Sequence, residues 1–274
     1  MPVTKASPKE MMPVVDKPLI QYAVEEAFEA GIREMIFVTG RNKGVISDHF
    51  DTNSELEAFL QTDGKEALLS TVRRILPSSV TCTYVTQEQP LGLGHAILCA
   101  REIVGEQNFA VLLPDDVILT SEEGCLSQML RKGQDDFTGL VAIQKVPDRD
   151  VSKYGIVSIQ KAESRLPHIV DIVEKPAINQ APSNLGVVGR YVLPAETMQI
   201  LESTPVGANG EIQLTDALAV LLSERVLLGC EFDGKRFDCG TKLGYLQANV
   251  EYGLRHPETA EEFRNWCQRR FPDS

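Results

Sequence analysis

The sequence lacks the features that disulfide-rich, zinc-finger and membrane proteins need. Its six cysteines form no C-x-x-C pair and no zinc-ligand spacing. A chain of 274 residues does not depend on disulfides for its stability, so reduced thiols are expected. The longest purely apolar stretches, such as Ala217 to Leu222, are far too short to span a bilayer, and no apolar run follows the first lysines. We therefore expect a soluble, cytoplasmic protein.

Positive charge is also scarce. The formal net charge is -12 at pH 7, whereas nucleic-acid backbones and anionic membranes attract basic stripes. We expect neither as a partner, although one local cluster of lysines could still hold a small anionic ligand. Internal repeats, low-complexity segments and flexible linkers are absent too, so a single domain over residues 1–274 is expected.

What the chain does contain is an alternation of helical and strand patterns. Apolar residues follow the spacing of one helix face from Ile20 to Phe28, and Gly31 stands where a helix C-cap belongs. Met35 to Val38 then runs apolar without alternation, which is typical of a strand covered on both faces. The alternation predicts an α/β fold, a Rossmann-like mixed, mostly parallel sheet flanked by helices.

The same patterns continue to the end of the chain. The shorter strands after about residue 137 predict a small antiparallel extension of the sheet. Strands are expected at 80–85, 109–113, 139–146, 155–159, 169–173 and 186–192, and helices at 96–104, 122–131, 195–201, 212–222, 243–253 and 259–270.

Ligands of open α/β sheets bind at the carboxyl ends of the strands, so the residues that follow each strand matter most. Asp115 and Asp116 follow a buried strand, and Asp238 lies in a glycine-containing turn before a helix. Each segment taken alone also fits a turn with a helix cap. Together, Asp115 and Asp238 could chelate magnesium, which takes one or two carboxylates and completes its shell with substrate phosphates.

Two other strand ends carry polar groups. Glu174 and Lys175 leave a strand side by side and would point to opposite faces, where they could serve two parts of one ligand. A solvated charge pair is the simpler interpretation. Gln87 could pair with the edge of a base, and Gly92 would let that base approach the backbone. The dinucleotide fingerprint is absent, because Ile97 stands where its third glycine belongs.

A set of short motifs keeps its order and spacing from residue 1 to about residue 270. The motifs are Pro8-Lys-Glu-Met-Met-Pro13 with Asp16-Lys-Pro18, Gln87 with Gly92-Leu-Gly-His95, Leu113-Pro-Asp-Asp116, Lys153-Tyr-Gly155, Val173-Glu-Lys-Pro176, Ser183-Asn-Leu185, Gly210-Glu-Ile-Gln-Leu-Thr-Asp216 and Asp238-Cys-Gly-Thr-Lys-Leu-Gly-Tyr245. Together they resemble the bacterial UTP:glucose-1-phosphate uridylyltransferases, also called UDP-glucose pyrophosphorylases. The last two motifs look like those of the uridylyl group, which disfavours a thymidylyl- or cytidylyltransferase.

The resemblance implies an activity and a set of residue roles. The activity is nucleotidyl transfer from UTP to glucose 1-phosphate, with UDP-glucose and pyrophosphate as products, Mg2+ as cofactor and a homo-oligomer, dimer or tetramer, as the assembly. The implied roles are magnesium binding by Asp115 and Asp238, uracil binding by Gln87 and Gly92, glucose binding by Glu174 with the Gly155 backbone, and phosphate binding by Lys175 on the sugar and Lys9 on the nucleotide.

The N-terminal segment raises a separate expectation. In this family a first strand and a loop of the form G-x-G-T-R-x-L-P precede the T-K-A-x-P-K-E segment, and Met1-Pro2 matches the last two positions of that loop. The resemblance implies that a central strand and a triphosphate-binding loop lie upstream in a longer product, and that the chain without them is nearly silent. The alternative is a natural short variant, catalytically silent or regulatory, that binds sugar nucleotide.

Overall fold

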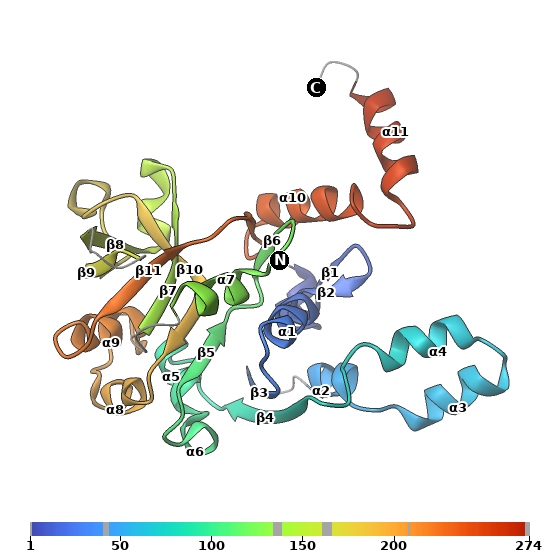
Figure 1. The fold of residues 1–274 in the computed structure, drawn as a ribbon, viewed down its shortest axis with the longest axis horizontal. Coiled ribbons are helices and arrows are strands. Elements are labelled where there is room, and N and C mark those ends of the chain that lie inside the picture. The colour runs from blue at the N-terminus through green and yellow to red at the C-terminus, as the bar shows by residue number, and fades with distance from the viewer. Residues whose placement is uncertain (1, 41–43, 134–138, 161–165, 208, 272–274) are drawn as a thin grey trace.

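The computed structural model describes residues 2–40, 44–133, 139–160, 166–207 and 209–271, so Met1 lies outside the described residues. Its centre is a six-stranded sheet in the order β5, β10, β7, β11, β9, β8 (Figure 1). The strands are β5 (Phe109–Leu112), β7 (Gly139–Lys145), β8 (Gly155–Gln160), β9 (His168–Glu174), β10 (Leu185–Leu193) and β11 (Leu227–Glu231).

The direction of these strands differs in part from the expectation. The α/β class and the mixed sheet are confirmed, and β11 runs parallel to β7. However, β10 is antiparallel to β5, β7 and β8, and β9 is antiparallel to β8 and β11, so the antiparallel share is larger than predicted. An unbroken apolar run indicates that both faces of a strand are covered, and it does not reveal the strand's direction.

A parallel pair, β3 (Glu34–Gly40) and β4 (Thr81–Gln87), forms a separate sheet. Among the described residues β3 pairs only with β4, and the β5 edge away from β10 is unpaired. A cavity of about 930 Å³ lies between β3 and β5. Met35 and Phe37 face the apolar cluster that contains helix α1, and Ile36 and Val38 face the cluster that contains α5. The expected further central strand stays a prediction.

The remaining pairs and helices surround these sheets. Two small antiparallel pairs are β1 (Pro13–Val14) with β2 (Lys17–Pro18) and β6 (Asp116–Leu119) with β12 (Lys235–Asp238). The α-helices are α1 (Leu19–Glu29), α2 (Gly44–Phe50), α3 (Ser54–Thr62), α4 (Glu66–Arg73), α5 (Leu93–Leu98), α6 (Arg101–Val104), α7 (Cys125–Lys132), α8 (Glu196–Ser203), α9 (Leu214–Leu221), α10 (Lys242–Gly253) and α11 (Ala260–Arg270). Short 3-10 turns occupy Pro2–Lys5, Lys9–Met11, Asp148–Lys153 and Ile178–Gln180.

Most predicted elements are present, but strands β6, β11 and β12 were not predicted, and several helices differ from the expectation. One helix was expected over 96–104, and the structure has two, α5 and α6, with Cys99 and Ala100 between them. The helix expected over 122–131 begins later, at Cys125. Helices α2, α3 and α4 were not predicted, because each buries only one or two apolar residues and so gives a weak periodic signal.

The structure also describes the cysteines and the lengths of the helices. The six cysteines are free thiols. Over the described ranges, every helix falls short of the length and apolar character that a membrane crossing requires.

Candidate active site

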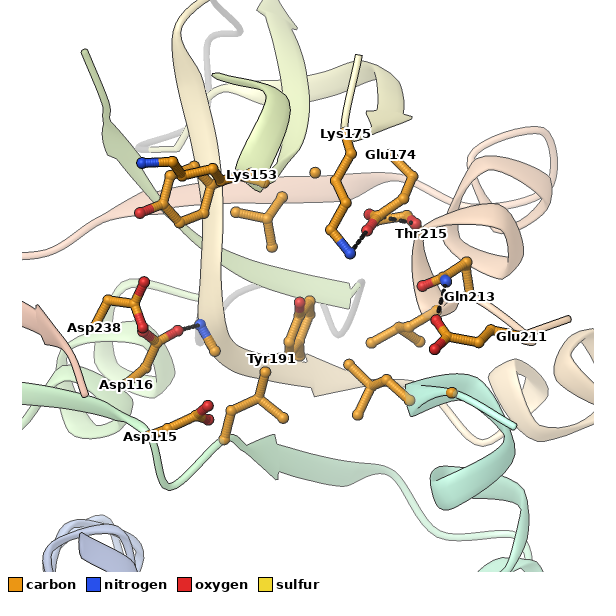
Figure 2. A pocket seen from close by; sticks show the side chains of 18 of the residues that line it. Asp115, Asp116, Lys153, Glu174, Lys175, Tyr191, Glu211, Gln213, Thr215 and Asp238 are labelled. Atoms are coloured by element: carbon orange, nitrogen blue, oxygen red, sulfur yellow. Dashed lines mark hydrogen bonds and ion pairs between the residues drawn. The ribbon is translucent and has the colours of Figure 1, made fainter. Parts of the chain in front are cut away.

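A pocket of about 430 Å³ opens where β5, β9 and β12 end (Figure 2). It brings together six of the eight residues expected to form a site, namely Gly92, Asp115, Gly155, Glu174, Lys175 and Asp238. The other two, Lys9 and Gln87, line the larger cavity between β3 and β5. Gly92 and Asp115 line both cavities, so the two spaces meet at these residues.

Asp115 and Asp238 lie close together although they are far apart in the sequence. Strand β12 pairs with β6 so that Asp238 stands opposite Asp116. The Cys239 N–H then donates to the backbone oxygen of Asp115 at 2.7 Å. A β-carbon built on Gly240 would lie 3.0 Å from Asp238 Oδ1 and 3.2 Å from Asp115 Oδ2. One point in space is therefore within contact distance of both carboxylates.

This arrangement fits a magnesium ion. The described residues include no cluster of three or more histidine, cysteine, aspartate or glutamate side chains that could hold a metal. Magnesium does not need one, because one or two carboxylates suffice when substrate phosphates complete its shell. The glycine at position 240 leaves the space between the carboxylates open, and a methyl group there would crowd both of them.

Lys9 reaches the same carboxylates from the N-terminal segment. Its Nζ lies 2.7 Å from Asp115 Oδ2. Partial burial opposes the charge of Lys9, but Asp115, with smaller contributions from Glu10 and Asp238, outweighs it and raises the pKa of the lysine above its ordinary value. Lys9 is therefore a firmly charged cation at the junction of the two cavities, where it can face an anionic ligand.

Asp116 has a structural role that differs from that of Asp115. Its carboxylate accepts hydrogen bonds from Arg236 Nε at 2.6 Å and from the Gly189 N–H at 2.8 Å. Burial raises the pKa of Asp116, and the Arg236 charge and these hydrogen bonds counteract that rise. Arg236 also lies over the Tyr154 ring, 5.0 Å from its centroid. Asp116 thus anchors the turn, and its oxygens are already engaged.

A buried arginine holds the same turn from beneath. Arg190 donates from Nη1 to the Leu113 oxygen at 3.0 Å and to the Gly189 oxygen at 3.1 Å. Its Nε and Nη2 bind the two carboxylate oxygens of Glu26 at 3.0 and 2.8 Å. The sequence analysis missed Arg190, and its signal was a lone charge inside an otherwise apolar strand, which needs a buried partner.

Glu174 and Lys175 lie at the other end of the pocket, and here the structure corrects the expectation. They were expected to point to opposite faces, but both line the pocket and Lys175 Nζ lies 3.2 Å from Glu174 Oε1. The reason is that Lys175 has a positive φ of 43°, which ends the strand geometry and turns its side chain back. The two side chains form the charge pair that the simpler interpretation expected, but the pair lines a pocket.

Thr215 and Gly155 surround the Glu174 carboxylate. Thr215 Oγ1 donates to Glu174 Oε2 at 2.9 Å. Gly155 pairs with Glu174 across β8 and β9, and a β-carbon there would lie 2.8 Å from Thr215 Cγ2 and 3.3 Å from Glu174 Oε2. The sequence analysis did not single out Thr215, although it lies within the motif that ends at Asp216.

Gln87 and Gly92 contact each other directly. Gln87 Nε2 donates to the Gly92 oxygen at 3.1 Å and, with the His95 ring unprotonated at Nδ1, to that nitrogen at 3.0 Å. Gly92 has a φ of 93°, and a β-carbon on it would lie 2.8 Å from Glu211 Cβ and 2.9 Å from the Ile212 oxygen. Packing against this loop therefore already requires glycine, and a role in binding a base stays a prediction.

Several further pocket residues carried no separate prediction. They are Lys153, Tyr154, Tyr191, Glu211, Gln213, Thr215 and Arg236. Most belong to the motifs of the resemblance, so spacing alone could have marked their segments without assigning each a part. Gln213 Nε2 donates to Glu211 Oε2 at 2.7 Å, which orients this pair beside the pocket (Figure 2).

Comparison with known proteins identifies the site's family. A family model described as Nucleotidyl transferase matches residues 1–254. The UTP–glucose-1-phosphate uridylyltransferase of Escherichia coli strain K12 is 48% identical over 276 residues, which covers 98% of this chain and 90% of that protein. The chain belongs to the family of UTP–glucose-1-phosphate uridylyltransferases. The family and the fold class inferred from the sequence are thereby confirmed.

Solved structures of uridylyltransferases agree with this assignment. A UTP-bound enzyme from Acinetobacter baumannii has a TM-score of 0.90 and 45% identity, and the match covers 97% of this chain and 93% of that one. A UDP-glucose pyrophosphorylase complexed with UDP-glucose has a TM-score of 0.85 and 43% identity, with coverage of 93% and 94%. The roles of individual residues in this uridylyltransferase stay predictions.

Proposed function

We propose that the chain transfers the uridylyl group of UTP to glucose 1-phosphate, giving UDP-glucose and pyrophosphate. The observation that carries the proposal is one pocket, in a member of this family, with two aspartates at one end and a glutamate–lysine pair at the other. This layout suits a reaction that joins a charged nucleotide to a sugar phosphate. No observation favours the regulatory alternative.

The reaction needs positioning and charge neutralisation more than acid–base chemistry. A phosphate oxygen of glucose 1-phosphate forms a bond to the α-phosphorus of UTP, and the bond from that phosphorus to the bridging oxygen breaks with release of pyrophosphate. The nucleophile is already an anion at neutral pH, so no general base is required. Lys175 holds the sugar phosphate and Lys9 faces the nucleotide phosphates, and both offset crowded negative charge.

Asp115 and Asp238 would hold Mg2+. Bound there, the ion neutralises phosphate charge and helps to align the reacting groups. Cys239 and Gly240 support this part of the site through the hydrogen bond to Asp115 and the open space between the carboxylates.

The two substrates are recognised at opposite ends. Glu174 accepts hydrogen bonds from glucose hydroxyls, with help from the Gly155 backbone. Thr215 donates to one carboxylate oxygen of Glu174 and so holds the carboxylate in place for the sugar. Gln87 and Gly92 bind the uracil from the cavity beside Lys9. We also infer a cytosolic location, which the free thiols of the chain support, and a homo-oligomer, which the resemblance to the family implies.

The test is a pyrophosphate-release assay with glucose 1-phosphate and magnesium, run in parallel with UTP, TTP and CTP. We expect UTP to give the highest rate and chelation of magnesium to abolish it. Asp238→Asn should lower the rate and raise the magnesium concentration needed for half-maximal rate. A higher rate with TTP or CTP would contradict the proposal. UDP-glucose binding without turnover of any nucleotide would favour the regulatory relative.

A further inference from the structure

His95 belongs to one of the motifs of the resemblance, but the proposed function gives it no part. It lies half-buried on α5, behind the residues that line the two cavities. Its ring contacts Gln87, which does line the larger cavity. His95 therefore stands next to the side chain that we assign to the uracil, on the side away from the ligand.

Two neighbours fix the direction of the Gln87 amide. The Gly92 carbonyl oxygen can only accept a hydrogen bond, so the group 3.1 Å from it is the amide nitrogen, Nε2. The same Nε2 lies 3.0 Å from His95 Nδ1. Because an amide nitrogen only donates, the neutral His95 ring accepts at Nδ1 and carries its proton on the other ring nitrogen.

Cys99 agrees with this tautomer of His95. Its Sγ lies 3.9 Å from the same Nδ1. Burial raises the pKa of the Cys99 thiol, so the thiol keeps its proton and can face Nδ1 as a weak donor. Both described neighbours of Nδ1 can therefore donate to it, which favours a lone pair at this nitrogen.

These contacts leave one end of the Gln87 amide for a ligand. Gly92 and His95 take the two hydrogens of Nε2, and over the described ranges no donor pairs with the amide oxygen, Oε1. Oε1 is thus an available acceptor on a residue that lines the cavity. N3 of uracil carries a hydrogen and needs an acceptor, whereas N3 of cytosine has a lone pair and needs a donor.

We propose that His95 is a positioning residue for Gln87, which holds the amide oxygen toward the base and so favours uracil over cytosine. Without an acceptor at position 95, the amide loses one of its two anchors and can turn its nitrogen toward the base. A site built to accept from a ligand N–H discriminates against a ligand that lacks it. The inference rests on the proposed function, because it takes Gln87 as a uracil contact.

Calorimetric titration with UDP-glucose and with CDP-glucose tests the inference, because binding needs no turnover. Leucine and asparagine are similar in size, but only asparagine offers an acceptor oxygen. His95→Leu should weaken UDP-glucose binding by about three- to tenfold, the effect of one hydrogen bond, and should leave CDP-glucose binding unchanged or stronger. A purely structural role would weaken both ligands alike, so an unchanged ratio of the two dissociation constants would overturn the inference.

His95→Asn is the conservative variant of this pair. Its side-chain oxygen can take the place of Nδ1 and accept from Gln87, so it should keep most of the preference for UDP-glucose. His95→Phe keeps a ring without an acceptor, and it replaces His95→Leu if circular dichroism shows that the leucine variant does not fold. An asparagine variant with the same lowered preference as the leucine or phenylalanine variant would contradict the role of an acceptor.

A second histidine–glutamine contact supplies a matched control. His49 Nε2 lies 3.0 Å from Gln21 Oε1, where α2 meets α1. His49→Leu should leave the ratio of the two dissociation constants unchanged, and a similar fall there would trace the effect to general loosening and overturn the inference. A wild-type chain that binds CDP-glucose as tightly as UDP-glucose would contradict the proposed function itself, and the inference with it.

Discussion

Thr215 controls the direction of a carboxylate that it touches. Its hydroxyl donates to Glu174 Oε2 from a buried position, and both side chains pack closely against Gly155. A hydrogen bond to a charged group contributes about 1.5 to 3 kcal/mol. Thr215 therefore acts as a positioning residue for the glutamate that we assign to the sugar.

Thr215→Val should change the KM for glucose 1-phosphate and leave kcat nearly unchanged. The KM for glucose 1-phosphate should rise by about tenfold with little change in kcat, because the hydrogen bond orients a ground-state contact. Thr215→Ser keeps the hydroxyl and should restore a nearly normal KM. A large fall in kcat with unchanged KM would show that Thr215 does not act through sugar binding.

Lys175 tests the other half of the same ion pair. Lys175→Ala should lower kcat by about 100-fold or more, because a charge that follows the transferred phosphate contributes most in the transition state. Glu174→Ala should mainly raise the KM for glucose 1-phosphate. Lys65, which pairs with Asp63 on the surface, offers a control, and Lys65→Ala should have wild-type kinetics. Wild-type kinetics for Lys175→Ala would reduce the pair to a surface contact.

At the scale of elements, the start of α5 depends on one glycine. Gly92 combines a positive φ with a close approach to the Glu211–Ile212 backbone. Gly64 also has a positive φ, of 69°, but a β-carbon there meets nothing within 4 Å. The two positions separate the cost of backbone strain from the cost of the clash.

Gly64→Ala should lower the free energy of unfolding by about 1 to 2 kcal/mol, the cost of a left-handed alanine. Gly92→Ala should cost clearly more, because the 211–212 loop must also move away. Urea unfolding followed by circular dichroism measures both. Equal losses would mean that the loop moves at no cost and that packing does not explain Gly92.

At the scale of the whole molecule, the Glu26–Arg190 pair joins distant parts of the chain. Glu26 belongs to α1, Arg190 to β10, and Glu26 Oε1 also accepts the Leu126 N–H at the start of α7. Arg190 is 1% exposed, so a lost partner leaves a buried charge without compensation. The pair therefore ties the sheet, two helices and the turn before Asp115 to one another.

Glu26→Ala should lower the free energy of unfolding by about 3 to 5 kcal/mol. The double substitution Glu26→Leu with Arg190→Met should cost less than the single one, because it removes both charges together. If residues 1–274 form a single domain, as we propose, unfolding should also follow one transition by fluorescence and by circular dichroism. A double variant as unstable as the single one would show that packing, and not the unpaired charge, sets the cost.

The sequence by itself determined the family, the α/β class and most of the elements. Local patterns carry this information, because apolar spacing marks one face of a helix and glycine marks its end, as at Gly31. The motifs also placed Asp115, Glu174, Lys175 and Asp238 in segments that end strands, where ligands bind. Weakly amphipathic helices such as α3 were not predicted, because few of their residues are buried.

Only the tertiary structure decided how those residues meet. Asp115 and Asp238 come together through the β6–β12 pairing, and this pairing joins segments more than a hundred residues apart. The direction of β10 could not be predicted, because an apolar run buried on both faces fits a parallel or an antiparallel strand. The positive φ of Lys175 could not be predicted either, because tertiary packing determines the backbone dihedrals at this strand end. Contacts between distant segments have no local pattern, so the fold must form before the site exists.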